Sequence, residues 1–427
     1  MSPVRPTVHV VGTRGSPDAH RLRDVLTRVA QPYEFHEADS PEAERLLAEA
    51  GAVGAELPVV IEGGMVHAGV TVRQLAEAWS MAAHPSRAHY DLAIIGAGPA
   101  GLAAAVYAAS DGLSTIVFER DVPGGQASHT ARIENFFGFP DGIGGAELAR
   151  RAGRQAEQFG AELMILSGVA GGTVEDGKVL LRSDSDDEVT AEVALATPGM
   201  EWRRLDVEGV DELLGRGVYY GAGRSEAGQC RDENVVVIGA GNSAGQAVLH
   251  LATSGARVTM MVRGDGLAKS MSAYLVERIQ HHPRIEIHTR SQVVAVHARD
   301  GHLDAVDIAK AGDGVQRLTA RALFICIGGR PRTGWAAASG VSTDSAGYLL
   351  TGPDLLEAGR RPVGWPLDRD PLVLETSIPG FFAAGDVRHG STKRVGGAVG
   401  EGAMAVALAH RRLDELANSA RRRGPQA

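Results

Sequence analysis

Apolar residues over the first 81 positions alternate between the period of a strand and the period of a helix. Leu22, Val25, Leu26 and Val29 follow the i, i+3, i+4, i+7 spacing of one helix face. The predicted elements are, in order, a strand over 7–11, a helix around 22–29, a short strand at Phe35, a helix over 41–50, a hairpin over 57–67 and a helix from Thr71 to Trp79. The pattern predicts a small β-α-β-α-β-β-α unit, and residues 84–89 form the linker that follows it.

A second pattern begins at Leu92, where four apolar residues predict a buried strand. The glycine-rich turn from Gly96 to Gly101 then opens a helix whose N-terminal N–H groups suit a diphosphate. The next strand, residues 115–118, ends in Glu119, which is placed to accept a hydrogen bond from a ribose hydroxyl. The order strand, glycine turn, helix, strand and terminal acid predicts a dinucleotide-binding site.

The same arrangement recurs at residues 234–244, where a strand runs into Gly239-Ala-Gly241-Asn-Ser-Ala244. The position that corresponds to Glu119 is Val262, which has no group for a ribose diol. Arg263 follows it and can pair with a 2′-phosphate. The second site is therefore predicted to prefer NADPH over NADH.

Composition and charge narrow the class of protein. The 427 residues suffice for two or three domains, and the net charge of −9 argues against a nucleic-acid partner. No signal peptide or membrane span is predicted, since the apolar run over 92–110 is already a strand and a helix. The only cysteines, Cys230 and Cys326, exclude a disulfide framework and indicate a cytoplasmic protein. The pair His281-His282 and the acidic run 184–188 are interpreted as solvated surface, so no metal site is predicted.

The order of elements in the N-terminal unit resembles a glutaredoxin or thioredoxin-fold domain. Such domains carry Cys-x-x-Cys where the first strand meets the first helix. The chain has Ser16-Pro-Asp-Ala19 there, so the resemblance implies the fold without its redox chemistry.

Residues 90–412 resemble a low-molecular-weight thioredoxin reductase, a flavoprotein with an NADPH domain inserted into an FAD domain. The motifs that carry this resemblance are, in order, Pro123-Gly-Gly-Gln126, Ile133-Glu-Asn-Phe-Phe-Gly138, Ala196-Thr-Pro-Gly199, Ile325-Cys-Ile-Gly328, Phe382-Ala-Ala-Gly-Asp386 and Val399-Gly-Glu-Gly-Ala403. The last of these resembles the start of the helix beside the flavin ring, and Asp386 is implied to hold the ribitol chain.

The resemblance and the glycine motifs together assign two sets of cofactor-binding residues. FAD is assigned to Gly96, Gly98, Pro99, Ala100, Gly101, Glu119, Arg120, Gly125, Gln126, Asn135, Thr197, Gly385, Asp386, Arg394 and Val395. NADPH is assigned to Gly239, Gly241, Asn242, Ser243, Ala244, Arg263 and Gly328. The resembled family tends to have a second arginine where this chain has Gly264, which implies a modest cofactor preference.

The chain departs from the family at the redox centre. Thioredoxin reductases place Cys-x-x-Cys after a Gly-Val-x-Tyr segment, but Gly217-Val-Tyr-Tyr220 is followed here by Gly221 and Arg224 at the cysteine positions. Cys230 lies six positions beyond Arg224 and is interpreted as a small buried residue, with a redox role as the alternative. His129 is a candidate proton donor to the flavin by position alone. An insertion over 351–370 either shapes an acceptor site or packs over the FAD domain or at a subunit contact.

We therefore expect an α/β protein in which a thioredoxin-like fold precedes two Rossmann-like, three-layer ββα nucleotide-binding domains. The expected domains are residues 1–83, a discontinuous FAD domain over 88–205 and 331–414, an NAD(P)H domain over 206–330, and a flexible tail over 415–427. The resemblance also implies a homodimer.

Three functions remain open from the sequence. The first is an NADPH-dependent FAD oxidoreductase that passes electrons directly to a quinone, another small molecule or a carrier protein. The second is a thioredoxin-disulfide reductase that uses another thiol, and the third is a binding protein that responds to the redox state of its flavin.

Overall fold

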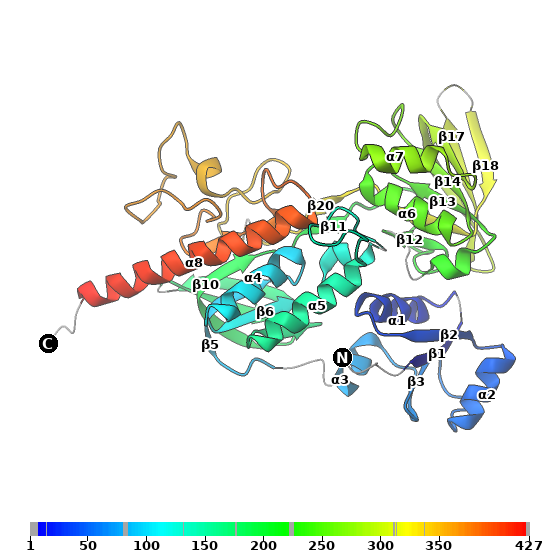
Figure 1. Cartoon of the computed structure of the whole chain (residues 1–427), viewed down its shortest axis with the longest axis horizontal. Coiled ribbons are helices and arrows are strands. Elements are labelled where there is room, and N and C mark those ends of the chain that lie inside the picture. Colours follow the sequence, from blue (N-terminus) through cyan, green and yellow to red (C-terminus); the bar gives the residue numbers. More distant parts are fainter. Residues whose placement is uncertain are drawn as a thin grey trace.

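The computed structural model describes residues 7–423 except 14, 80–83, 131, 176, 222–225, 311, 313 and 337. Figure 1 shows a central body crossed by one long helix, a second body at one end of it, and the N-terminal unit beneath both. No helix within the described residues is both long and apolar enough to cross a membrane.

The N-terminal unit is a four-stranded sheet in the order β2-β1-β3-β4, covered by three helices. Its elements are β1 (Val8–Gly12), α1 (Pro17–Arg28), β2 (Tyr33–Glu37), α2 (Pro41–Glu49), β3 (Val59–Glu62), β4 (Met65–Ala68) and α3 (Val72–Ala78). Ser16 and Ser40 cap α1 and α2, each followed by proline at the first helical position, and Thr71 forms a capping box with Gln74. Val8 and Val10 pack with α1 and α3, whereas Val11 packs with α2 on the opposite face of the sheet.

The central body is built on a mixed sheet in the order β7-β6-β5-β10-β9-β8, with β21 added beside β10. Its elements are β5 (His89–Ile95), α4 (Pro99–Ser110), β6 (Thr115–Glu119), the 3-10 helix η1 (Gly125–His129), α5 (Gly145–Gln158), β7 (Glu162–Ile165), β8 (Val169–Glu175), β9 (Lys178–Ser183), β10 (Glu188–Ala196), η3 (Gly352–Leu355), β21 (Phe381–Ala383), η4 (Gly385–Val387) and α8 (Val395–Arg423). Strands β5, β6 and β7 are parallel neighbours, as are β5 and β10.

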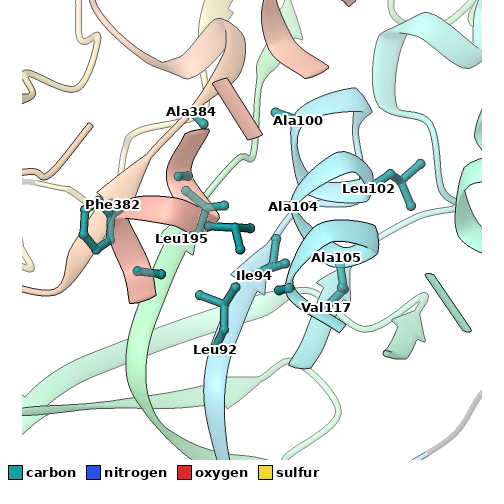
Figure 2. Packing of buried hydrophobic residues seen from close by; sticks show 14 of the residues in the cluster. Leu92, Ile94, Ala100, Leu102, Ala104, Ala105, Val117, Leu195, Phe382 and Ala384 are labelled. Carbon is teal, nitrogen blue, oxygen red and sulfur yellow. The ribbon is translucent and has the colours of Figure 1, made fainter. Parts of the chain in front are cut away.

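The core of this body lies where α4 and α8 cover the sheet. Figure 2 shows Leu92 and Ile94 of β5 and Leu195 of β10 beside α4, with Phe382 of β21 at the far side of the same cluster. Alanines occupy most of the buried face of α4, and a Cβ on Gly402 of α8 would lie only 2.1 Å from the carbonyl oxygen of Ala100. Small residues therefore let α8 run close along α4, which places the N-terminus of α8 over the carboxyl ends of the strands.

The second body is a five-stranded parallel sheet in the order β12-β19-β13-β14-β15, with a three-stranded antiparallel sheet beside it. Its elements are β12 (Val218–Tyr220), η2 (Ala227–Cys230), β13 (Asn234–Ile238), α6 (Asn242–Thr253), β14 (Arg257–Val262), α7 (Ala273–Gln280), β15 (Ile285–Thr289), β16 (Ser291–Arg299), β17 (His302–Lys310), β18 (Gly314–Thr319) and β19 (Ala322–Ile325). Strands β11 (Met200–Trp202) and β20 (Gly329–Pro331) pair antiparallel where the chain leaves and re-enters the central body.

The insertion over 351–370 is held to the central body by one arginine. Arg369 donates to the fully buried carboxylate of Glu375 at 2.6 and 3.1 Å, and to Glu415 of α8 at 2.7 and 2.9 Å. The indole N–H of Trp365 donates to the carbonyl of Arg369 at 2.6 Å. These contacts pack the insertion over the sheet and α8, one of the alternatives left open by the sequence.

Candidate functional site

The glycine turn between β5 and α4 fits only because two positions, Gly96 and Gly101, lack a side chain. Gly96 has φ of +106°, and a Cβ there would lie 2.5 Å from the carbonyl oxygen of Thr197. A Cβ on Gly101 would lie 1.9 Å from the carbonyl oxygen of Gly96. Gly98, by contrast, faces open space, with no atom within 4 Å of its Cβ position. The turn therefore packs tightly on one side and exposes bare backbone at the N-terminus of α4 on the other, as a phosphate group requires.

Glu119 ends β6 beside this turn with its carboxylate almost fully buried. One oxygen accepts a hydrogen bond from the backbone N–H of Ala97 at 2.8 Å, and the other accepts one from Asp121 at 3.0 Å. Burial raises the pKa of the Glu119 carboxyl, and the two backbone donors oppose that rise. The carboxylate is thus fixed in one orientation at the rim of the turn.

The second half of the site comes from the far end of the chain. Gly385 and Asp386 follow β21, and the N–H of Gly385 donates to Glu401 of α8 at 2.7 Å. Arg388 also donates to Glu401, at 2.6 and 3.2 Å, so α8 fixes this turn. Burial raises the pKa of the Asp386 carboxyl, against the opposing charge of Lys393.

The start of α8 corrects one sequence prediction. The helix begins at Val395, one turn before the 399–403 segment that was expected to open it. Positions 395–398 are valine, two glycines and alanine, which are small enough to lie at the wall of the cavity described next. The 399–403 segment instead lies within the helix, where it supplies Glu401 and Gly402 for packing.

One cavity of about 1020 Å³ joins the two halves. The predicted FAD residues that line it are Gly96, Gly98, Pro99, Ala100, Glu119, Arg120, Gly125, Gln126, Asn135, Thr197, Gly385, Asp386, Arg394 and Val395. Gly101 is absent from the lining because it packs against the strand turn. The cavity is large for a ligand pocket, and its open glycine backbone and oriented carboxylates fit a dinucleotide.

The second glycine turn opens toward the same cavity. Gly239 has φ of +146°, and a Cβ there would lie 2.3 Å from the carbonyl oxygen of Cys326. Gly241 caps α6, and Asn242 and Ser243 in the first turn of α6 line the cavity. The remaining residues predicted to bind NADPH are placed outside the lining, namely Gly239, Gly241, Ala244, Arg263 and Gly328. Arg263 is exposed directly after β14, at the end of the strand next to the turn.

Several lining residues were not found from the sequence. Gln246 lies one turn after Asn242 on α6, a helical spacing that could have indicated it. Tyr274 of α7, Trp202 of β11 and Lys393 before α8 also line the cavity. Arg28 lines it from the N-terminal unit. No local pattern predicts that contact, because it depends on how two separate units dock.

The sequence predicts that Gly221 and Arg224 stand where the resembled family has its dithiol, and the two cysteines of the chain lie at other positions. Gly221 follows β12, and Arg224 lies outside the described residues. Cys326 donates from Sγ to the carbonyl oxygen of Gly221 at 3.2 Å, and burial raises the pKa of this thiol to about 12. Cys230 is buried on η2. With a pKa of about 12, the Cys326 thiol is almost entirely protonated at neutral pH and is a poor nucleophile.

A smaller cavity of about 210 Å³ has Tyr220 and Glu226 in its lining. Residues from α1, from the central body and from β12 line it, and it shares Arg28, His129 and Trp202 with the large cavity. Burial and the nearby charge of Arg28 lower the pKa of His129. This imidazole is therefore neutral at pH 7, and its Nδ1 lies 3.7 Å from the carboxylate of Asp24.

Helix α1 contacts both nucleotide-binding bodies. Toward the central body, Arg28 donates to Asp121 at 2.6 Å and to Ser128 at 3.0 Å. Toward the second body, His20 of α1 lies 2.8 Å from the carboxylate of Glu226 and packs on the ring of Tyr219. Figure 1 shows α1 as the helix of the N-terminal unit that faces the rest of the molecule. The N-terminal unit thus packs against both bodies.

Known proteins match the part of the chain that follows this unit. A family model described as pyridine nucleotide-disulphide oxidoreductase matches residues 90–402. A thioredoxin reductase of Treponema pallidum is 33% identical over 338 residues, covering 77% of this chain and 99% of the relative. One from Bacillus subtilis is 30% identical over 328 residues, covering 77% and 96%. The crystal structure of Lactococcus lactis thioredoxin reductase in its FR conformation is similar, with a TM-score of 0.67 and 30% identity, covering 76% of this chain and 99% of that one.

Proposed function

The chain belongs to the pyridine nucleotide-disulphide oxidoreductase family and is an NAD(P)H-dependent flavoprotein oxidoreductase that uses FAD and NADPH, and we propose that it passes electrons from the flavin directly to an acceptor, without an internal dithiol. The acceptor class is a quinone, another small molecule or a carrier protein. The observation that carries the proposal is the single cavity onto which the α4 turn, the Asp386 turn and the first turn of α6 all open.

Different residues around this cavity would bind the two cofactors. Gly98 and the N-terminus of α4 would hold the pyrophosphate of FAD, Glu119 its ribose and Asp386 its ribitol chain. Asn242 and Ser243 would bring NADPH to the same space from α6. When bound, FAD supplies the hydride and electron chemistry, whereas the protein supplies binding and orientation.

The proposed outlet for electrons lies where the sequence departs from the pattern of the family that it resembles. Gly221 stands at the expected position of the first relay cysteine, the thiol of Cys326 that donates to its carbonyl oxygen is protonated, and the neighbouring Tyr220 lines the smaller cavity. A small acceptor in that space would be bordered by His129 and Trp202, which also border the large cavity. This arrangement supports direct transfer from the flavin.

Rapid mixing under anaerobic conditions tests the proposal. NADPH should bleach the flavin absorbance, and a panel of quinones, ferredoxin, thioredoxin and oxygen should then identify which acceptor restores it. Rapid return of the absorbance with a quinone or ferredoxin supports direct transfer. Return of the flavin absorbance with thioredoxin, but with no other acceptor of the panel, would contradict direct transfer.

Replacement of Asp386 tests the second half of the FAD site. Asp386→Ala removes a half-buried carboxylate from the cavity wall, so we expect FAD to dissociate about 10–100-fold more readily, the equivalent of about 1–3 kcal/mol. Equilibrium dialysis against free FAD measures this change. Asp354→Ala on η3 is the matched control, because Asp354 is exposed and outside the lining, and it should leave FAD affinity unchanged.

Replacement of Arg263 tests the choice of nicotinamide cofactor. Because Arg263 is exposed at the end of β14, we propose that it pairs with the 2′-phosphate of NADPH. Arg263→Ala should lower kcat/KM for NADPH about tenfold, as expected for loss of one charge-assisted contact, and leave NADH use nearly unchanged. Arg299→Ala, in the β16–β17 hairpin, is the control. Equal efficiency of the two cofactors in the unmodified protein would show that the assignment is wrong.

A further inference from the structure

Three metal-binding side chains meet on the outer face of the N-terminal sheet. His9 lies on β1, and Glu34 and His36 lie on the neighbouring β2. The strand register pairs His9 with Glu34 and Val11 with His36, so all three side chains point to the α2 face of the sheet. Among the described residues, this is the group of histidine and carboxylate ligands whose donor atoms all lie within 4.8 Å of one another.

The distances between the donor atoms fit one ion. His9 Nδ1 and His36 Nε2 are 3.1 Å apart, and a carboxylate oxygen of Glu34 lies 3.5 Å from the first and 3.8 Å from the second. Zinc binds nitrogen and oxygen ligands at about 2.0–2.2 Å, which in a tetrahedron separates the ligands by about 3.3–3.6 Å. The separations of 3.1, 3.5 and 3.8 Å lie within and on either side of that range, so small movements of the side chains would bring all three donors to one ion.

The surroundings of the three donors are also suitable. The His36 side chain is 12% exposed and that of His9 is 31% exposed, so both rings are held by the sheet. Glu34 is 61% exposed and leaves one side open to solvent. Two imidazoles and one carboxylate with an open fourth position form a common zinc ligand set.

We propose that His9, Glu34 and His36 bind a divalent transition metal ion, zinc in the first instance, that links β1 to β2. The site lies on the face of the sheet opposite to α1, which contacts the nucleotide-binding bodies. Metal binding there stabilises the N-terminal unit and leaves the flavin cavity untouched. The proposal does not depend on the proposed electron acceptor.

Zinc titration of the full-length protein tests the site. The FAD-loaded protein is stripped of metal with a chelator, dialysed and titrated with zinc chloride in competition with a chromophoric chelator. We expect one ion per chain, and we expect His9→Gln and His36→Gln each to weaken binding at least tenfold. Glu34→Gln should also weaken zinc binding. Because the Glu34 side chain is mostly exposed, this variant should fold, and it replaces a histidine variant that fails to fold.

A two-donor pair elsewhere in the chain provides the matched control. His288 lies 2.7 Å from Glu286 on β15, and this pair is not part of the three-donor group. His288→Gln should therefore leave zinc binding unchanged. Zinc should raise the melting temperature of the unmodified protein but not that of His36→Gln. Absence of saturable zinc binding, or equal affinity in the unmodified protein, His36→Gln and Glu34→Gln, would overturn the proposal.

Discussion

Anaerobic titration with NADPH should reduce this protein with one hydride equivalent per FAD, and the reduced protein should not turn over thioredoxin. A disulfide relay needs an attacking thiolate and a resolving thiol close by. Gly221 stands where the first thiol would be, and Cys326, whose Sγ donates to the Gly221 carbonyl oxygen, has a pKa raised by burial to about 12. Without an internal dithiol there is no second place to store electrons. The measurement is flavin absorbance against added NADPH, paired with a thioredoxin-coupled disulfide assay.

The two cysteine variants make this expectation specific. Cys230→Ser and Cys326→Ser should both keep the one-hydride endpoint and the rate with a non-thiol acceptor. Uptake of a second hydride equivalent that disappears in Cys230→Ser would show that this buried thiol has taken over the relay. A thioredoxin-dependent rate lost in either variant would refute direct transfer as the main route.

The nucleotide-binding cores could be predicted from sequence because their constraints are local. Gly96 and Gly239 both adopt positive φ, and a Cβ on Gly101 would lie 1.9 Å from the carbonyl oxygen of Gly96 in the same turn. These constraints arise within a short stretch of chain, so a short stretch of sequence reveals them. Residues far apart in the chain, such as Asp386, were assigned through the resemblance to a family, and Asp386 lines the same cavity as Gly98.

The features that sequence did not reveal depend on contacts between separate elements. His9 and His36 are 27 positions apart and come together only through the pairing of β1 with β2, so no spacing rule for metal ligands detects them. The expected start of α8 was one turn too late because it rested on the resemblance of the 399–403 segment to a family motif. The first turn of the helix contains glycines at 396 and 397, whose helix propensity is low, and packing against α4 outweighs that propensity.

The N-terminal unit contacts both nucleotide-binding bodies through α1. Here Arg28 attaches α1 to the central body while His20 attaches it to Glu226 of the second body. Rotation of the second body would break one of these sets of contacts. We therefore expect the unit to hold the arrangement in which the first turn of α6 lines the large cavity.

Loss of the Arg28 side chain should therefore lower the free energy of unfolding more than loss of an exposed side chain of the same unit. Arg28 is 6% exposed and donates to Asp121, Ser128 and the carbonyl oxygen of Val122. Arg28→Ala leaves the carboxylates of Asp121 and Asp24 without their shared cation. Asp121 is 42% exposed and recovers part of its hydration, so we expect a loss of about 3 kcal/mol, at the lower end of the range for a broken buried ion pair. Urea unfolding followed by circular dichroism measures the change.

The order in which the protein unfolds distinguishes docking from general stability. If Arg28 attaches the N-terminal unit to the central body, Arg28→Ala should unfold in two steps, with the N-terminal unit first and flavin release second. Arg45→Ala removes the exposed partner of Glu42 on α2 of the same unit, and we expect it to change stability by less than about 0.5 kcal/mol. A single unfolding step in Arg28→Ala, with flavin release at the same urea concentration as in Arg45→Ala, would show that Arg28 does not hold the two parts together. Two separated steps would identify α1 as the element that fixes the nucleotide-binding bodies relative to each other.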